Sequence, residues 1–256
     1  MGTTAHGRIL VWEGASLWIL SAPPGERYPN TDLHSHHVIQ LTLALTGHIE
    51  FDGDAGRVTG DAIVVAPDAP HSFGGTGLVA HVFIASESQA GREMVRGLLS
   101  NGPIARVPGD LLGDLPARLR ATFEDARHTE DGLRALGRDL VARLAGARVR
   151  TERVDPRIAR LIVWVATRLD QAVGLDAAAS VVGLSKARTR HLFVEQTGLS
   201  FRTYLLWLRL MRAVEMFAAG ASLTEAGHAA GFSDSAHLSR TFRRMFGIAA
   251  ASLRVS

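Results

Sequence analysis

The chain reads LDAAASVVGLS at residues 175–185 and LTEAGHAAGFS at residues 223–233, which are two versions of one pattern. Each stretch starts as a short helix, turns at a glycine, and ends on a serine able to cap another helix. The matching leucines, glycines and serines all lie 48 residues apart. A helix, a glycine-containing turn and a second helix form the helix-turn-helix motif. The sequence therefore predicts two such motifs in tandem.

The segments around this repeat are also helical in pattern. A second helix follows each serine, at residues 186–197 and 234–246, and a long helix at 201–218 joins the two motifs. Upstream, the Asp-Pro pair at 155–156 has the residue types that begin a helix. We therefore expect an all-α domain over residues 151–256.

The two halves of the chain differ in charge. Residues 151–256 carry 14 basic and 8 acidic side chains, whereas residues 1–150 carry 14 and 17. A basic C-terminal half favours a polyanionic partner. The alternative is a basic surface that faces only solvent.

Several classes of protein are excluded by composition. The chain has no cysteine, which excludes a disulfide scaffold, a thiolate metal site and a cysteine nucleophile. No apolar run approaches the roughly 20 residues of a membrane span, and the first residues lack the pattern of a secretory signal. We expect a cytoplasmic protein without a membrane partner.

Four phrases of the C-terminal half resemble the DNA-binding domain of the AraC/XylS family of transcription regulators. They are GLSFRTY at 198–204, RLMRA at 209–213, GFSD at 231–234 and LSRTFRRMFG at 238–247. The resemblance implies a DNA-binding domain with two helix-turn-helix units, and with it a homodimer that binds a double-stranded operator and has RNA polymerase as a further candidate partner.

The second helix of each motif would place its outward side chains in the major groove. These outward positions are Ala187, Arg188, Arg190 and His191 in the first motif, and Ser235, Ala236, His237 and Arg240 in the second. Arg190 is the strongest candidate for a bidentate contact with guanine. Contacts with the phosphate backbone are expected from Lys186, Arg202, Arg243 and Arg244. For each arginine taken singly, the alternative is a surface salt bridge.

The first half of the chain reads as short strands. Apolar runs occur at 8–12, 16–20, 38–45, 48–51, 62–66 and 78–84, and turns rich in Gly, Pro and Asp separate them. Such spacing predicts a β barrel over residues 1–110, because closure removes exposed strand edges. The fold class is therefore α+β with two domains. Leucines at helical spacing then predict two amphipathic helices within 111–150, with a break at Gly132 and its neighbours. These helices serve as linker and dimer contact, or they pack only on the barrel.

One group of polar residues stands out in the strand region. His34 and His36 would point to the same face of an extended segment, and Gln40 shares their parity. His71 follows a Pro-Asp-Ala-Pro turn, and His81 lies on the run 78–84 as a further wall residue. The spacing of the first four resembles the two motifs of the cupin superfamily, with Gln40 where that family has glutamate and Ala69 where it has glycine.

The cupin resemblance implies an effector site made of His34, His36, Gln40, His71 and His81. The first four of these are also candidate ligands of Zn²⁺, Ni²⁺ or Fe²⁺. Alternatively, the histidines form a polar pocket for an organic molecule. We expect a DNA-binding regulator controlled by a small molecule or a metal ion rather than an enzyme. The alternative is a metal-dependent cupin enzyme fused to a DNA-binding domain.

Overall fold

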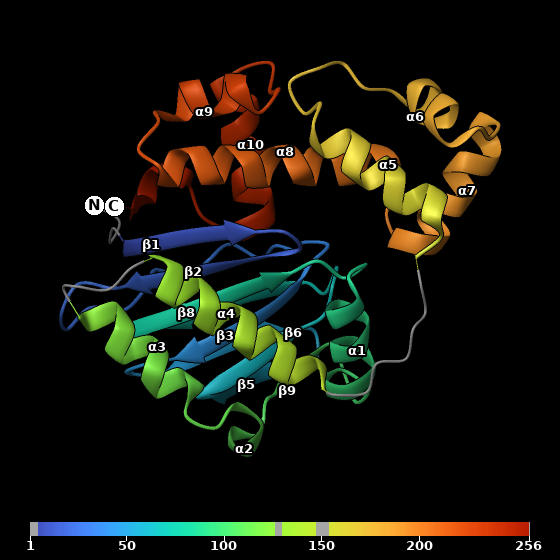
Figure 1. Ribbon diagram of the computed structural model, residues 1–256. Helices are drawn as coiled ribbons and strands as arrows, with labels where there is room; N and C mark the ends of the chain where they lie inside the picture. Colours follow the sequence, from blue (N-terminus) through green and yellow to red (C-terminus); the bar gives the residue numbers. More distant parts are fainter. Residues whose placement is uncertain (1–4, 126–129, 147–153, 256) are drawn as a thin grey trace. The chain divides into compact units, whose positions relative to one another are not determined.

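The computed structural model describes residues 5–125, 130–146 and 154–255 (Figure 1). These residues form two compact units. The first contains Met1–Val149 together with Phe242–Ser256, and the second contains Arg150–Thr241. The boundary therefore falls inside the last long helix, α10 (Ser235–Phe246). Each unit is described by itself.

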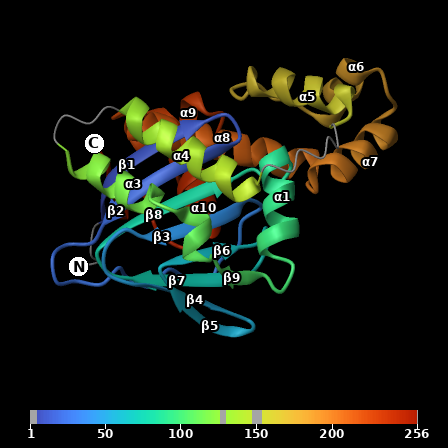
Figure 2. The same ribbon diagram turned by 60° about the horizontal axis from the view of Figure 1, so that its bottom comes forward.

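The first unit is built on two β-sheets, and the larger sheet is not closed into the barrel expected from the sequence. The larger sheet has the strand order β10-β1-β2-β8-β3-β6-β9, and the smaller has the order β5-β4-β7. Figure 2 shows the smaller sheet as a separate layer. The outer strands β9 and β10 have three residues each, so the sheet limits its exposed edges by shortening them instead of by closure.

The strands of the described residues follow one another in chain order. They are β1 (Ala5–Trp12), β2 (Ala15–Ser21), β3 (Ile39–Ala44), β4 (Ile49–Gly53), β5 (Gly56–Gly60), β6 (Ala62–Val65), β7 (His71–Gly75), β8 (Leu78–Ile84), β9 (Ile104–Arg106) and β10 (Leu253–Val255). The pairs within both sheets are antiparallel except β1 with β10, which are parallel.

Both faces of the larger sheet are buried. Successive side chains of a strand point to opposite faces, so β2 sends Leu17 and Ile19 to one side and Trp18 to the other. Leu17 and Ile19 belong to one large apolar cluster with residues of the helices. Trp18 instead contacts aromatic rings on the opposite side of the sheet. This double burial explains why the strands read as continuous apolar runs.

Helices of the first unit lie on the first of these faces. They are α1 (Gln89–Leu98), α2 (Gly109–Leu112), α3 (Leu115–Glu124) and α4 (Glu130–Ala145). Figure 1 shows α4 crossing the strands, and its stripe Leu133, Leu136, Leu140 and Leu144 is buried in the same cluster as the sheet. The apolar stripe of α4, which was a candidate dimer contact in the sequence, therefore packs against the sheet of its own unit. The expected break at Gly132 and its neighbours lies slightly upstream, because α3 ends at Glu124 and α4 begins at Glu130, with Gly132 in its first turn.

The C-terminal segment, residues 242–255, packs on the other face of the larger sheet. Phe246 lies against Trp18 and Phe83, with ring centroids 4.7 Å and 5.3 Å apart, and Phe242 stacks on Trp18 at 6.1 Å. Beyond α10 the chain forms a short 3₁₀ helix (Ala250–Ser252) and then β10, which pairs with β1. From the sequence, Phe242 and Phe246 are expected in the core of the second helix-turn-helix motif, together with Phe232 and Leu238. The rings of Phe242 and Phe246 instead pack in the first unit.

The second unit contains α5 (Pro156–Ala166), α6 (Leu175–Val182), α7 (Lys186–Thr197), α8 (Phe201–Ala218), α9 (Leu223–Ala229) and the first part of α10. The predicted helix starts at Asp155, Ser185 and Ser200 are confirmed, because each side chain accepts a hydrogen bond from a backbone amide of its helix. Gly183 and Gly198 end α6 and α7 with positive φ, a conformation that glycine adopts without strain. For α10 the amide of His237 donates to Asp234 at 2.6 Å, so Asp234 replaces the expected Ser233 as the cap.

Among the described residues, no helix has the length and apolar character required to cross a bilayer.

We predict that Leu140→Ala lowers the free energy of unfolding of the first unit by about 2–5 kcal/mol, because Leu140 is fully buried and the substitution leaves a cavity. Asp139→Ala, on the exposed side of the same helix turn, is the control and should change it by less than about 0.5 kcal/mol. Urea denaturation followed by circular dichroism measures both. Equal effects of the two substitutions would contradict burial of the α4 stripe.

Candidate functional site

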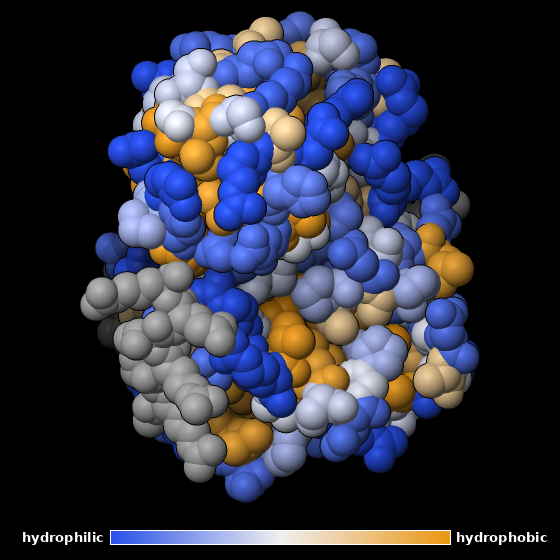
Figure 3. Space-filling view, turned by 90° about the vertical axis from the view of Figure 1, so that its right-hand side faces the viewer, coloured by the Kyte–Doolittle hydropathy of each residue, from blue (hydrophilic) through white to orange (hydrophobic). Residues whose placement is uncertain are grey.

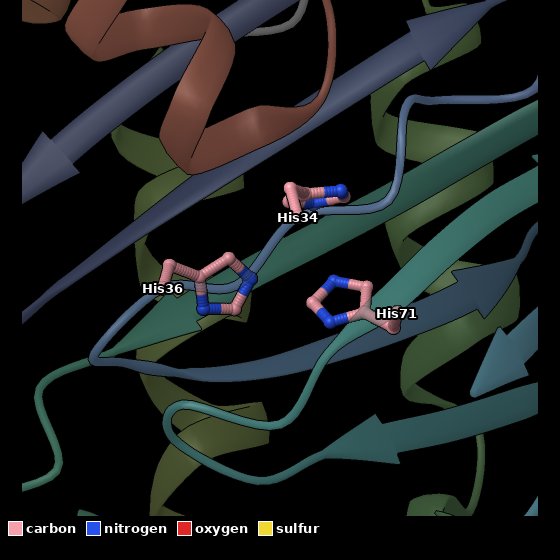
Figure 4. Close-up of side chains that lie close together, drawn as sticks. All are labelled: His34, His36 and His71. Carbon is pink, nitrogen blue, oxygen red and sulfur yellow. The ribbon is translucent and has the colours of Figure 1, made fainter. Parts of the chain in front are cut away.

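Three histidines gather in the interior of the first unit. His34 and His36 lie before β3, and His71 begins β7. The backbone amides and carbonyls of His34 and His71 bond to each other at 3.0 Å and 2.9 Å, which brings the two segments together. The ring centroids are 4.3 Å apart for His34 and His71 and 5.0 Å apart for His36 and His71. All three rings lie around one small space (Figure 4).

Backbone hydrogen bonds set the tautomer of each ring. The Nδ1 atoms of His34, His36 and His71 lie 2.8 Å, 3.0 Å and 2.8 Å from backbone carbonyl oxygens. A carbonyl only accepts, so each Nδ1 carries the hydrogen and donates it. In a neutral imidazole the Nε2 atom then keeps its lone pair. This is the arrangement by which proteins orient histidines that bind metal through Nε2.

Gln40 on β3 connects this histidine cluster to β8. Its Oε1 lies 2.8 Å from Nε2 of His36 and 3.2 Å from Nε2 of His71. Its Nε2 donates to Thr42 Oγ1 at 3.1 Å and lies 3.3 Å from Nδ1 of His81. Because Nδ1 carries the hydrogen on both His36 and His71, their Nε2 atoms and Gln40 Oε1 all point lone pairs at one another and repel. A bound cation, or rotation of the amide so that its NH₂ faces the imidazoles, relieves this repulsion.

Burial keeps the histidines uncharged. Removal from water lowers the pKa of His34 to about 4 and that of His81 to about 3. The same cause lowers the pKa of His36 and His71, and the neighbouring imidazoles lower that of His71 further. All four rings are therefore neutral at pH 7, which is the form in which imidazole binds metal.

The histidine cluster fits a divalent metal in its donor set. The candidate ligand atoms of His34, His36 and His71 all lie within 4.8 Å of one another, and all three residues are buried. Imidazole nitrogens suit Zn²⁺, Ni²⁺ and Fe²⁺. Gln40 Oε1 is placed to act as a fourth donor. The buried triad can hold such an ion.

A cavity of about 60 Å³ lies beside the cluster. His34, Gln40 and His81 line it, whereas His36 and His71 are not among its lining residues. The other lining residues were not identified from the sequence: Ala5, Trp18, Leu20, Tyr28, Pro29, Thr31, Phe73, Phe83, Phe246, Ile248, Ser252 and Leu253. Strand parity could have indicated Trp18, Leu20 and Phe83, since they alternate with residues of the helix-covered face. No such sequence pattern indicates that residues of the C-terminal segment line the cavity.

The helices predicted to read DNA expose the expected side chains. On α7, Ala187, Arg188, Arg190 and His191 are exposed, while Thr189, Leu192 and Phe193 are buried. On α10, Ala236 and Arg240 are exposed, Ser235 and His237 are half-buried, and Leu238 is buried. Figure 3 looks onto the side of the molecule that carries α6 and α7, where hydrophilic side chains surround smaller apolar patches.

Two of the four residues expected at the phosphate backbone are in ion pairs. Lys186 bonds to Asp176 at 2.8 Å, and Arg243 bonds to Asp32 at 2.7 Å. Both pairs are largely exposed, so they contribute little to stability and can exchange for another anion. Arg202 and Arg244 are exposed.

Comparison with known sequences supports the helix-turn-helix assignment. Residues 178–255 match a family model described as a helix-turn-helix domain. The chain is similar to the HTH-type transcriptional activator RhaS of Escherichia coli O9:H4 (strain HS), with 34% identity over 108 residues. This match covers 42% of the chain and 39% of RhaS, so the chain spans about two fifths of the length of this curated relative. RhaS of strain K12 / DH10B matches to the same extent.

Two solved structures resemble nearly the whole chain. ToxT from Vibrio cholerae O395 has a TM-score of 0.55 and 10% identity, over 93% of this chain and 95% of that chain. Wild-type ToxT from Vibrio cholerae strain SCE256, solved with an unsaturated fatty acid, has a TM-score of 0.53 and 10% identity, over 97% and 94%. At this identity the likeness concerns the fold alone. The chain is thus a two-part α+β protein whose helical part contains the helix-turn-helix domain that the sequence motifs predicted.

We predict that the protein binds Zn²⁺ after dialysis against EDTA. His71→Ala should lower the zinc affinity by more than about a hundredfold, because loss of a residue that only hydrogen-bonds to a metal ligand already lowers metal affinity about 10–100-fold. His48→Ala is the control, because His48 is exposed and outside the cluster. Isothermal titration calorimetry on the full chain measures both. Equal zinc affinity in the two variants would exclude the cluster as the metal site.

Proposed function

We propose that the protein is a sequence-specific DNA-binding regulator of transcription, controlled by a small molecule or a metal ion bound in a cupin-like first unit. One observation carries the proposal: two capped helices with exposed outer faces, α7 and α10, each follow one of the two similar stretches that lie 48 residues apart, in a region that matches a helix-turn-helix domain. The proposed DNA-binding domain is residues 151–256, of which the last part, from Phe242, packs in the first unit. The proposed sensor is residues 1–110, and the helices of residues 111–150 that follow it pack in the same unit.

The exposed face of α7 has the chemistry for reading bases. Arg190 carries a planar guanidinium that can donate two hydrogen bonds to O6 and N7 of guanine. Ala187 and Ala236 can each contact a thymine methyl group, and His237 and Arg240 can donate to bases or phosphates. Two reading helices on one chain would address major-groove faces about one turn, or 34 Å, apart.

The first unit holds the proposed effector site that regulates DNA binding. Its histidine cluster and cavity are buried, polar at one side and apolar at the other, which is typical of a small-molecule site. ToxT, which has a similar fold, has been solved with an unsaturated fatty acid, and this supports a small-molecule effector for this chain. Occupancy must favour one arrangement of the chain over another to alter DNA affinity.

A metal ion is the second candidate signal. The three Nε2 lone pairs of the histidine cluster and Oε1 of Gln40 favour it. The homodimer contact, if it involves α3 and α4, must use their outer faces, because the leucine stripe of α4 is buried in the first unit.

We predict that Arg190→Ala weakens binding to a DNA site selected with the wild-type protein by about 1–3 kcal/mol and relaxes the base preference at one position. The control is Arg120→Ala, which removes an exposed arginine of α3 in the first unit. Gel-shift titrations at fixed salt measure both. Unchanged affinity and preference in Arg190→Ala would remove Arg190 from the interface.

A further inference from the structure

The cavity of the first unit has an uncharged wall. Rings of Trp18, Phe73, Phe83 and Phe246 and the side chains of Leu20 and Leu253 make up much of it. All the residues that line it belong to the described part of the chain, and none of them is an aspartate, glutamate, lysine or arginine. The ion pair between Asp32 and Arg243 is exposed and outside the lining.

One side of this wall offers hydrogen bonds. Gln40 contributes an amide, which can both donate and accept. His81 lies on the same side and is only 7% exposed. Its Nδ1 is 3.0 Å from Thr42 Oγ1, while its Nε2 has no hydrogen bond with the described residues. A buried polar atom without a partner is costly, so a ligand that bonds to it gains affinity.

We propose that the effector bound in this cavity is an uncharged, largely apolar or aromatic molecule, whose polar end bonds to Gln40 and His81. In the metal-free protein, a carboxylate or ammonium group would lose its water here without meeting an opposite charge, and this makes its burial unfavourable. The inference deepens the proposed function, since it names the chemical class of the effector; ligand binding itself does not depend on DNA binding.

The same cavity connects the effector to α10. About 60 Å³ is several times the roughly 10–15 Å³ that one water molecule needs, yet it is small for an aromatic molecule. A ligand of this class must therefore move part of the wall. Phe246, the last residue of α10, and Leu253 of β10 form the C-terminal part of this wall, and β10 pairs with β1 over three residues whereas β2 pairs with β8 over seven. Displacement of this part of the wall moves Phe246 and with it the C-terminal end of α10, the helix that also carries Arg240.

The test compares two isosteric probes, benzamide and benzoate, which have nearly the same shape and differ in charge. Ligand-observed NMR on the full chain, dialysed against EDTA, measures the affinity of each. We expect benzamide to bind with a Kd on the order of 1 mM and benzoate at least about tenfold more weakly. Equal or tighter binding of benzoate, or no binding of benzamide, overturns the proposal.

Three variants locate the probe. Ile248→Trp fills the cavity from its half-buried C-terminal wall and should abolish benzamide binding. Ser252→Arg places a cation in the wall and should reverse the preference, so that benzoate binds more tightly than benzamide. Ala251→Arg adds the same charge at the exposed neighbouring position and is the matched control, expected to behave as wild type. Benzamide binding that Ile248→Trp leaves intact, or an identical response of the two arginine variants, places the probe elsewhere and overturns the proposal.

A gel shift of the same wild-type preparation separates this inference from the proposed function. Specific DNA binding without discrimination between the probes contradicts the inference and leaves the regulator intact. Discrimination between the probes without DNA binding contradicts the regulator and leaves the inference intact.

Discussion

Burial of the larger sheet on both faces is the constraint on which the rest of the first unit depends. Alternation along β2 and β8 sends one set of side chains into the helix-covered core and the other set toward Trp18, Phe83 and the histidines. The second face needs a cover, and the C-terminal segment provides part of it through Phe242 and Phe246. The unit is therefore completed by residues from the far end of the chain.

The buried histidine cluster belongs to the same interior. Polar groups in an apolar surrounding require partners, and here each Nδ1 has a backbone carbonyl. The Nε2 atoms of His36 and His71 face the side-chain oxygen of Gln40, and their lone pairs are available to a cation. A metal site and an apolar cavity thus lie next to each other and share His34 and Gln40. The end of α10 is the part of the helix-turn-helix region that belongs to this same unit.

Local signals predicted local structure well. Caps such as Ser185 and Ser200 and the left-handed glycines act within one turn of a helix, so the sequence indicates them directly. The grouping of His34, His36 and Gln40 followed from strand parity. β7 was missed because its pair of glycines at 74–75 lacks strand propensity, and its place is set by pairing with β4. The cover supplied by Phe246 depends on contacts with strands from the other end of the chain, which no local pattern encodes.

The central claim is that the end of α10 and the segment after it fold with the sensor. Hydrogen–deuterium exchange of the full chain across a urea series tests this most directly. The account predicts that amides of residues 243–255 lose protection together with those of β1 and β2. Loss of their protection together with α9, while β1 and β2 stay protected, would contradict it.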